Sequence, residues 1–541
     1  MNRAPAGNLT GVRSVETVVV LVALATVVAA FAGRLRVPAP SLLVVAGVVA
    51  GLLPGVPQVH VPPAMVSLVV LPPLLYAASE ELPWRDVQAV WRPVVALAVG
   101  LVAASAAAVA AVAVVVAGLP VGLAFVLGAV LASTDPVAVS ALSRRIWLPS
   151  RIQALVQAES LFNDGTSLVL FQVAVSAVTG AAAGTVAGTL WHGAGQFVLL
   201  AGGGVLAGAV VAAGAMLLRY RITDPVLETV AALLTPYVAY LLGAALHVSG
   251  VTAVIVAGLV IGARRERITT AQTRLQLHSV YQTVIFVLES AVFSLIGLEL
   301  PTLVRDLGTS GPWPVAALAV TGTLMAVRIA WVFPLSALYR RRTGTRGPAW
   351  PAAAVISWAG ARGVVPLAAA LSIPLATDSG APLPHRDLVL VLATAAIVIS
   401  LVVQGFTLEP LARLAGYGPG GRPGHEETIA RLRLAEAGLA RLDELAGQDA
   451  APDAVIDRLR ASLQAAIGSS RADLDPDNQE AGDQDREVPT EHQVRRELAA
   501  AENAELARLF EDGTISAATR QRLQRGLDLE IARLAETEPQ P

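Results

Sequence analysis

The 541-residue chain contains no cysteine and no lysine, and only 15% of its residues are charged. The lack of cysteine excludes disulfides, thiolate catalysis and zinc or iron sites built on cysteine. Soluble globular proteins carry roughly 25% charged residues, whereas 55% of this chain is hydrophobic. The composition therefore predicts a membrane protein. No basic surface interleaved with aromatic residues is visible either, so we expect no nucleic-acid partner.

The charges that are present divide the chain into two parts. Residues 1–420 hold 24 bases and 16 acids, while residues 421–541 hold 15 bases and 25 acids. We expect a transmembrane domain over 1–420 and an acidic helical cytoplasmic tail over 421–541. The tail has helical periodicity at 426–446, 453–467, 491–511 and 515–536. Its acidic stretch at 469–489 is predicted to be disordered. A regulatory or dimer-contacting tail and a merely solvated one both remain open.

Apolar runs long enough to cross a bilayer fill the first part. A transmembrane helix needs about 20 apolar residues, and the pattern predicts an all-α, multi-pass membrane protein of about thirteen spans. The predicted spans are 14–33, 38–54, 63–79, 93–117, 121–142, 152–179, 186–218, 226–246, 250–263, 278–300, 313–339, 349–373 and 387–412.

The loops predict the orientation and a repeat. Arginines gather after every odd-numbered span up to the eleventh, for example Arg144 and Arg145 after span five and Arg340 to Arg342 after span eleven. We expect the protein to lie in the plasma membrane. The positive-inside tendency then predicts that the amino terminus is outside the cell and that the tail is in the cytoplasm. Two six-span halves joined by one extra helix would be inverted repeats, a common transporter plan in which span five corresponds to span twelve.

Span six carries a polar face inside the membrane. Glu159, Ser160, Asn163 and Asp164 are spaced so that they share one side of a helix. Carboxylate, hydroxyl and amide oxygens are hard ligands that suit a small hard cation. Charged residues at this depth are costly and are functional candidates by default. The alternative is a buried polar network that only holds helices together.

Span five is predicted to be broken at Thr134-Asp135-Pro136. Proline removes a backbone donor and opens the helix, and irregular backbone inside a bilayer is tolerated only beside a cavity or protein. The same tripeptide recurs at Thr223-Asp224-Pro225, at the start of a span. There it predicts an ordinary N-cap followed by proline in the first turn. The mid-membrane copy at Asp135 instead indicates a binding site.

Span twelve is predicted to be broken as well. Gly360 and Gly363 flank Arg362, and Pro366 follows. Two interrupted helices in equivalent positions of the two halves indicate a transport site between them. Arg362 cannot lose its proton, so it requires a carboxylate, and we expect Glu159 to form a structural ion pair with it.

These motifs, in this order and spacing, resemble the monovalent cation/proton antiporters of the sodium/hydrogen exchanger type, in their bacterial NhaP-like branch. The resemblance covers about residues 14–413. It implies that a cation and a proton compete for Asp164, with Asn163, Ser160, the Thr134 carbonyl and Asp135 around it. It also implies a six-helix core that moves against a dimerisation domain in a homodimer. The transported Na⁺ and H⁺ would be the only ions required, with no cofactor.

One position departs from that pattern. Many members carry an acid after the proline pair of span three, where this chain has Tyr76, and Glu80 and Glu81 come only near the cytoplasmic end. A ligand role for span three is therefore in doubt. Glu228 and Arg328 are expected in structural pairs or at interfaces, and not as ligands.

The predicted function is that of a secondary active antiporter, not an enzyme. Asn163 stands beside Asp164 where a second acid would allow a second proton, so we expect electroneutral exchange of Na⁺ for H⁺ in pH and sodium homeostasis. Two alternatives stay open: a K⁺/H⁺ antiporter, since ligand types do not separate sodium, lithium and potassium, and a transporter of another solute on the same fold. A potassium-type channel filter is absent from the sequence.

Overall fold

A computed structural model gives the fold of most of the chain. It describes residues 26–28, 39–53, 66–82, 84–136, 148, 150–179, 186–222, 224–264, 271–307, 312–343, 350–377, 380–417, 425–447 and 453–474. The chain divides into two compact units, Met1–Gly421 and Arg422–Pro541.

The first unit is built from helices, without a named strand in the residues just given. Its elements in chain order are α2 (Ala39–Leu52), the π-helical turn η1 (Val66–Val70), α4 (Leu71–Glu81), α5 (Trp84–Val95), the π-helical turn η2 (Ala96–Leu101), α6 (Val102–Ala117), α7 (Val121–Leu131), α9 (Ser150–Thr179), α10 (Val186–Arg219), α11 (Pro225–Ala245), α12 (Gly250–Gly262), α14 (Ala271–Leu307), α15 (Trp313–Thr343), α16 (Trp350–Trp358), α17 (Val364–Leu371) and α18 (Arg386–Leu414).

Each of spans two to thirteen overlaps a described helix, although parts of spans three and five lie outside the described residues, as does the first span apart from 26–28. Seven of the described helices are long and apolar enough to cross a membrane, and α2, α7 and α12 are shorter apolar helices. The prediction of an all-α, multi-pass membrane protein is therefore confirmed.

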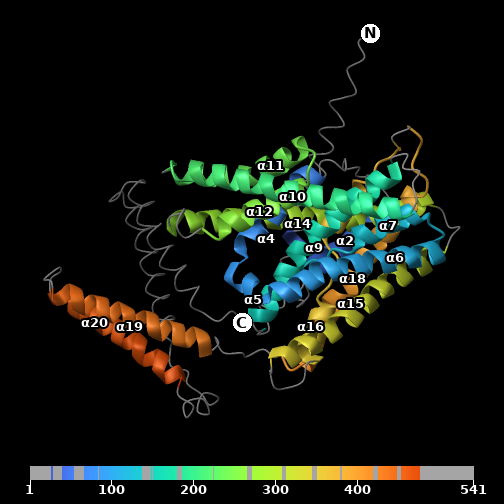
Figure 1. Ribbon diagram of the computed structural model, residues 1–541. Helices are drawn as coiled ribbons and strands as arrows, with labels where there is room; N and C mark the ends of the chain where they lie inside the picture. The colour runs from blue at the N-terminus through green and yellow to red at the C-terminus, as the bar shows by residue number, and fades with distance from the viewer. Residues whose placement is uncertain are drawn as a thin grey trace, which may run out of the picture. The chain divides into compact units, whose positions relative to one another are not determined.

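Small residues let these helices pack closely. Gly47 of α2 lies directly against the backbone of Ser294 and Gly297 in α14, and Gly128 of α7 lies against the backbone of Ala106 in α6. A side chain at either glycine would overlap the neighbouring helix. Close backbone approach of this kind is how helices associate where water supplies no hydrophobic driving force. In Figure 1, α10, α11 and α12 run alongside one another, in agreement with their mutual contacts.

The start of α11 confirms the prediction for the second Thr-Asp-Pro tripeptide. Asp224 is the N-cap, and its carboxylate accepts hydrogen bonds from the backbone N–H groups of Val226 and Leu227 at 2.7 and 3.4 Å. Pro225 occupies the first turn, where its missing N–H costs nothing. Asp224 is exposed. This copy of the motif therefore forms the amino end of a helix, as predicted.

The second unit contains α19 (His425–Gly447) and α20 (Asp453–Leu474), which pack on each other. Arg460 pairs with Asp443 at 2.8 Å, and Arg471 pairs with Glu436 at 3.1 Å. The predicted disordered stretch at 469–489 is wrong at its start, because residues 469–474 continue α20. The rest of that stretch and the two later predicted helices lie outside the described residues.

Candidate functional site

Two interrupted helices meet in the middle of the first unit. The α7 helix ends at Leu131 and is followed by non-helical backbone over 133–136, and the chain is unwound between the end of α16 and the start of α17. The backbone N–H of Asp135 donates a hydrogen bond to the carbonyl of Ala361 at 2.7 Å. Both predicted interruptions are confirmed, and they are in direct contact.

Asp135 lies at the start of α17. Its side chain packs against Gly363, the N-cap of that helix, so closely that a Cβ at Gly363 would overlap the carboxylate. The amino end of a helix carries a partial positive charge that stabilises a nearby anion. Only glycine fits this contact. The negative charge of Asp135 is thereby held where the second broken helix resumes.

The unwound turn at Thr134 is held by α9. Asn163 accepts a hydrogen bond from the Thr134 N–H at 3.2 Å, and its amide nitrogen donates to the Thr134 hydroxyl at 2.6 Å. The hydroxyl of Ser160 donates to the Thr134 carbonyl. All three side chains are buried. One face of α9 therefore replaces the helical hydrogen bonds that α7 loses when it unwinds.

Asp164 lies one residue further along α9 and is buried, with 7% of its surface exposed. Its Oδ1 atom has no hydrogen-bond partner among the described residues. Asp135 and Arg362 are the charged groups near enough to act on it electrostatically. A buried carboxylate oxygen that is not hydrogen-bonded can take a proton or ligate a cation, but burying it bare costs much free energy.

The predicted ion pair between Glu159 and Arg362 is wrong. The Glu159 carboxylate instead binds the Arg328 guanidinium from α15 through two hydrogen bonds, of 2.5 and 2.9 Å. Both side chains are almost fully buried. Such a two-point contact is the geometry in which arginine satisfies a carboxylate best.

Arg328 also binds the end of α16. Its guanidinium donates to the carbonyls of Ile356 and Ser357 at 3.0 to 3.2 Å. The last carbonyls of a helix have no partner within the helix, and a cation there also complements the negative end of the helix dipole. Arg328 lies midway along the 31-residue α15, and this depth marks it as a candidate for a buried charge pair but does not identify its partners.

Arg362 has different partners from those expected. Its Nη1 donates to the Ser133 carbonyl at 2.9 Å, and its backbone N–H donates to the Ser400 hydroxyl at 3.1 Å. The Arg362 side chain, from the unwound segment before α17, thus bonds a carbonyl of the unwound segment after α7. Glu159 and Asp164 act on Arg362 only at longer range, through electrostatic attraction.

The side chains of Tyr76 and Glu228 make buried contacts of a structural kind. Tyr76 is fully buried, and its ring stacks on that of Tyr281 with centroids 6.0 Å apart. Glu228 forms a buried ion pair with Arg219 at 3.2 Å, as expected of a structural pair.

The place where the two unwound segments meet, at Asp135 and Ala361, is called the crossing below. The charges near it almost cancel. Glu159 and Arg328 neutralise each other, which leaves Asp135 and Asp164 against Arg362. With both acids ionised, this group carries one net negative charge. One monovalent cation or one proton would balance it.

Known proteins are similar to this chain in sequence and in fold. Residues 20–414 match the family described as "Sodium/hydrogen exchanger, transmembrane". An uncharacterized Na⁺/H⁺ exchanger of Mycobacterium tuberculosis is 35% identical over 448 residues, which are 81% of this chain and 81% of that protein. The Na⁺/H⁺ antiporter ApNhaP of Aphanothece halophytica is 30% identical over 411 residues, covering 75% of this chain and 76% of its own.

The fold also matches a solved structure, that of the sodium proton antiporter MjNhaP1 from Methanocaldococcus jannaschii at pH 8. The TM-score is 0.59 at 19% sequence identity, and the match covers 75% of this chain and 99% of that one. The family match spans the whole described membrane unit from α2 to α18. The chain therefore belongs to the sodium/hydrogen exchanger family.

Proposed function

We propose that the chain exchanges sodium ions for protons across the cytoplasmic membrane, with Asp164 binding the two ions in turn. The observation that carries this proposal is the buried Asp164 Oδ1 atom, which lacks a hydrogen-bond partner in the described part of the chain and lies beside an unwound helix. A group that is buried and charged requires a counter-charge, and a single proton or a single Na⁺ supplies it.

The neighbours of Asp164 provide a cation site. The Thr134 carbonyl and the Ser160 hydroxyl offer neutral oxygen ligands, while Asp135 adds a second carboxylate. Oxygen ligands of this kind suit an alkali metal cation. Asn163 holds Thr134 in position through two hydrogen bonds. We assign the cation site to Asp164, Asp135, Ser160 and the Thr134 carbonyl, and the proton site to Asp164.

Alternating access follows from the cost of moving a bare charge. A charged side chain in an apolar region of the membrane costs several kcal/mol, on the order of 3 by insertion scales. The core therefore moves readily only when Asp164 carries a proton or a cation. Since one ion of either kind brings the crossing to neutrality, the exchange is one proton for one sodium ion and electroneutral.

The setting of the exchange rests on the sequence. The arginine-rich loops after the odd-numbered spans support an amino terminus outside the cell and a cytoplasmic tail. We further propose a homodimer that serves pH and sodium homeostasis and requires no cofactor, as the resemblance described in the sequence implies. A K⁺/H⁺ antiporter is the alternative, and a comparison of Na⁺, Li⁺ and K⁺ by dissipation of a pH gradient distinguishes the two.

Asp164→Asn tests the site. Asparagine is similar in shape but cannot bind a proton or counter a cation, so we expect Na⁺-dependent proton exchange in proteoliposomes to fall at least a hundredfold. The matched control is Asp224→Asn, which alters the exposed copy of the same tripeptide and keeps a good N-cap. It should exchange at the wild-type rate. Retained exchange in Asp164→Asn would overturn the site, and a transport current that scales with membrane potential would overturn electroneutrality.

A further inference from the structure

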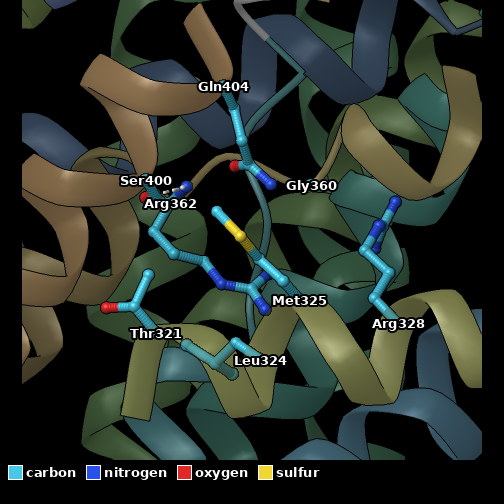
Figure 2. A pocket seen from close by; sticks show the side chains of 8 residues that line it. All are labelled: Thr321, Leu324, Met325, Arg328, Gly360, Arg362, Ser400 and Gln404. Carbon is cyan, nitrogen blue, oxygen red and sulfur yellow. Dashed lines mark hydrogen bonds between the residues drawn. The ribbon is translucent and has the colours of Figure 1, made fainter. Parts of the chain in front are cut away.

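A small cavity lies beside the crossing, among α15, α18 and the unwound segment that carries Arg362. Its volume is about 10 Å³, which is room for roughly one water molecule. Polar and apolar side chains line it together, and they include those of Gln404, Ser400, Arg362, Arg328, Leu324 and Met325. Figure 2 shows the side chains of Gln404 and Arg362 reaching into the same space.

Gln404 requires a partner there. Its side chain is 2% exposed, and its Oε1 atom has no hydrogen-bond partner within the described residues. An amide oxygen buried without a donor is destabilising. In Figure 2 this amide points down toward Met325, and the Arg362 guanidinium lies on the far side of the Met325 sulfur, at the edge of the same cavity. The missing donor must therefore come from within the cavity.

The surroundings determine which ligand can supply that donor. Two guanidinium groups border the cavity, and its lining contains no carboxylate, so a second metal cation would be repelled. A space for one water leaves no room for a larger anion. Arg362 has five N–H donors and no acceptor, and one of them is used by the Ser133 carbonyl. A water molecule can accept from Arg362 and donate to Gln404 at the same time.

The predicted repeat also indicates a special position for Gln404, by comparison with the first half. Ser160 and Asp164 are four residues apart on α9, and Ser400 and Gln404 are four residues apart on α18. Each serine bonds the unwound segment of its own half: Ser160 donates to the Thr134 carbonyl, and Ser400 accepts from the Arg362 N–H. The second half thus has a neutral amide at the place where the first half has its acid.

We propose that this cavity is a site for one buried water molecule, bound between Gln404 and Arg362, and that Gln404 acts through it as a positioning residue for the exchange. The water holds the Arg362 guanidinium against the Ser133 carbonyl and away from Asp164. Because the acceptor is an amide, Arg362 is oriented without losing its charge. This inference rests on the proposed exchange at Asp164.

Two substitutions of Gln404 should shift the KM for Na⁺ in opposite directions. Gln404→Leu removes the acceptor, so Arg362 can turn toward Asp164 and compete with sodium. We expect the KM to rise about tenfold. Gln404→Glu keeps an acceptor oxygen but adds a negative charge that draws Arg362 away from Asp164. We expect the KM to fall severalfold. The measurement is the initial rate of Na⁺-dependent proton movement in proteoliposomes.

Val403→Leu is the control, because Val403 is the preceding residue of α18 and is 39% exposed. It should leave the KM unchanged. A role of Gln404 in packing alone would lower the yield of folded protein without moving the KM in opposite directions, and unchanged or parallel shifts would overturn the proposal. If Gln404→Leu fails to fold, the KM of Gln404→Glu still decides.

A structure of the wild-type protein at a resolution that shows ordered waters tests the site without transport. We expect one peak of density within hydrogen-bond distance of both Gln404 Oε1 and the Arg362 guanidinium, and an empty or collapsed space would overturn the proposal. Exchange by the wild-type protein is a separate result, so failure of the proposed function is distinguishable from failure of the water site.

Discussion

The two unwound segments at the centre of the membrane unit have the same architecture but different chemistry. In the first half, α9 presents an acid and hydrogen-bonding oxygens to the break after α7. In the second half, α18 presents a serine and an amide to the break before α17, and the charges there are arginines. One half is therefore suited to an exchangeable cation, while in the other a fixed guanidinium takes the cation's place. On the proposed assignment, the protein has a single exchange site because, among the described residues at the two unwound segments, only the first half has a buried carboxylate oxygen without a hydrogen-bond partner.

Loss of Arg328 should have the largest effect on folding, because it leaves Glu159 buried without a counter-charge. We expect Arg328→Gln to lower the free energy of unfolding by about 3–5 kcal/mol. The measurement is the melting temperature in detergent. Pairing it with Glu159→Gln removes the isolated charge, so the double variant should recover much of the loss. A double variant as unstable as Arg328→Gln would contradict the assigned ion pair.

Gly363→Ala should disrupt the contact between the two halves. The added Cβ would overlap the Asp135 carboxylate, so either the aspartate or the start of α17 must shift. We expect exchange to fall about tenfold or more, with a smaller loss of stability, on the order of 1–3 kcal/mol for overpacking.

Gly322→Ala is its control. Gly322 lies inside α15 with open space around it, where alanine is favoured over glycine by about 1 kcal/mol. This variant should be as stable as wild type or more so, and fully active. Normal exchange in Gly363→Ala would show that the close contact is unnecessary for transport.

Ser160→Ala and Ser400→Ala compare the two halves at equivalent positions. Ser160 lies at the proposed cation site, so its loss should raise the KM for Na⁺ about tenfold. Ser400 accepts one hydrogen bond from the Arg362 backbone, and its loss should cost about 1 kcal/mol of stability with the KM changed twofold at most. Equal KM shifts in the two variants would contradict the division between an exchanging half and a fixed half.

Much of the fold could be predicted from the sequence because membrane spans are recognised by the length and hydrophobicity of their apolar runs. The broken helices were also predictable, since Pro136 and the pair Gly360 and Gly363 mark positions where a helix cannot continue. The distinction between Asp135 and Asp224 followed from depth alone, because the two tripeptides are identical but only one lies far from a span end.

The partner of Glu159 was not predictable in the same way. Arg328 and Arg362 both lie deep in spans, and either could neutralise the acid on charge alone. The choice depends on the end of α16, whose carbonyls require a donor that Arg328 supplies. Such a contact between distant segments leaves no local pattern. Gln404 was missed because an uncharged side chain in an apolar span gives a weak signal.

The bridge from Glu159 to Arg328 joins α9 of the first half to α15 and, through the carbonyls of Ile356 and Ser357, to α16 of the second. Because this ion pair is buried, a relative movement of α9 against α15 and α16 would have to separate the two charges inside the protein, which costs several kcal/mol. On the proposed mechanism, the relative movement of helices would therefore take place at another contact. One such contact is that of α9 with α12, where the Ile255 side chain lies against Gly165. If the proposed ion site is correct, α9, α15 and α16 would move together relative to α12, and the ion bound at Asp164 would move with them.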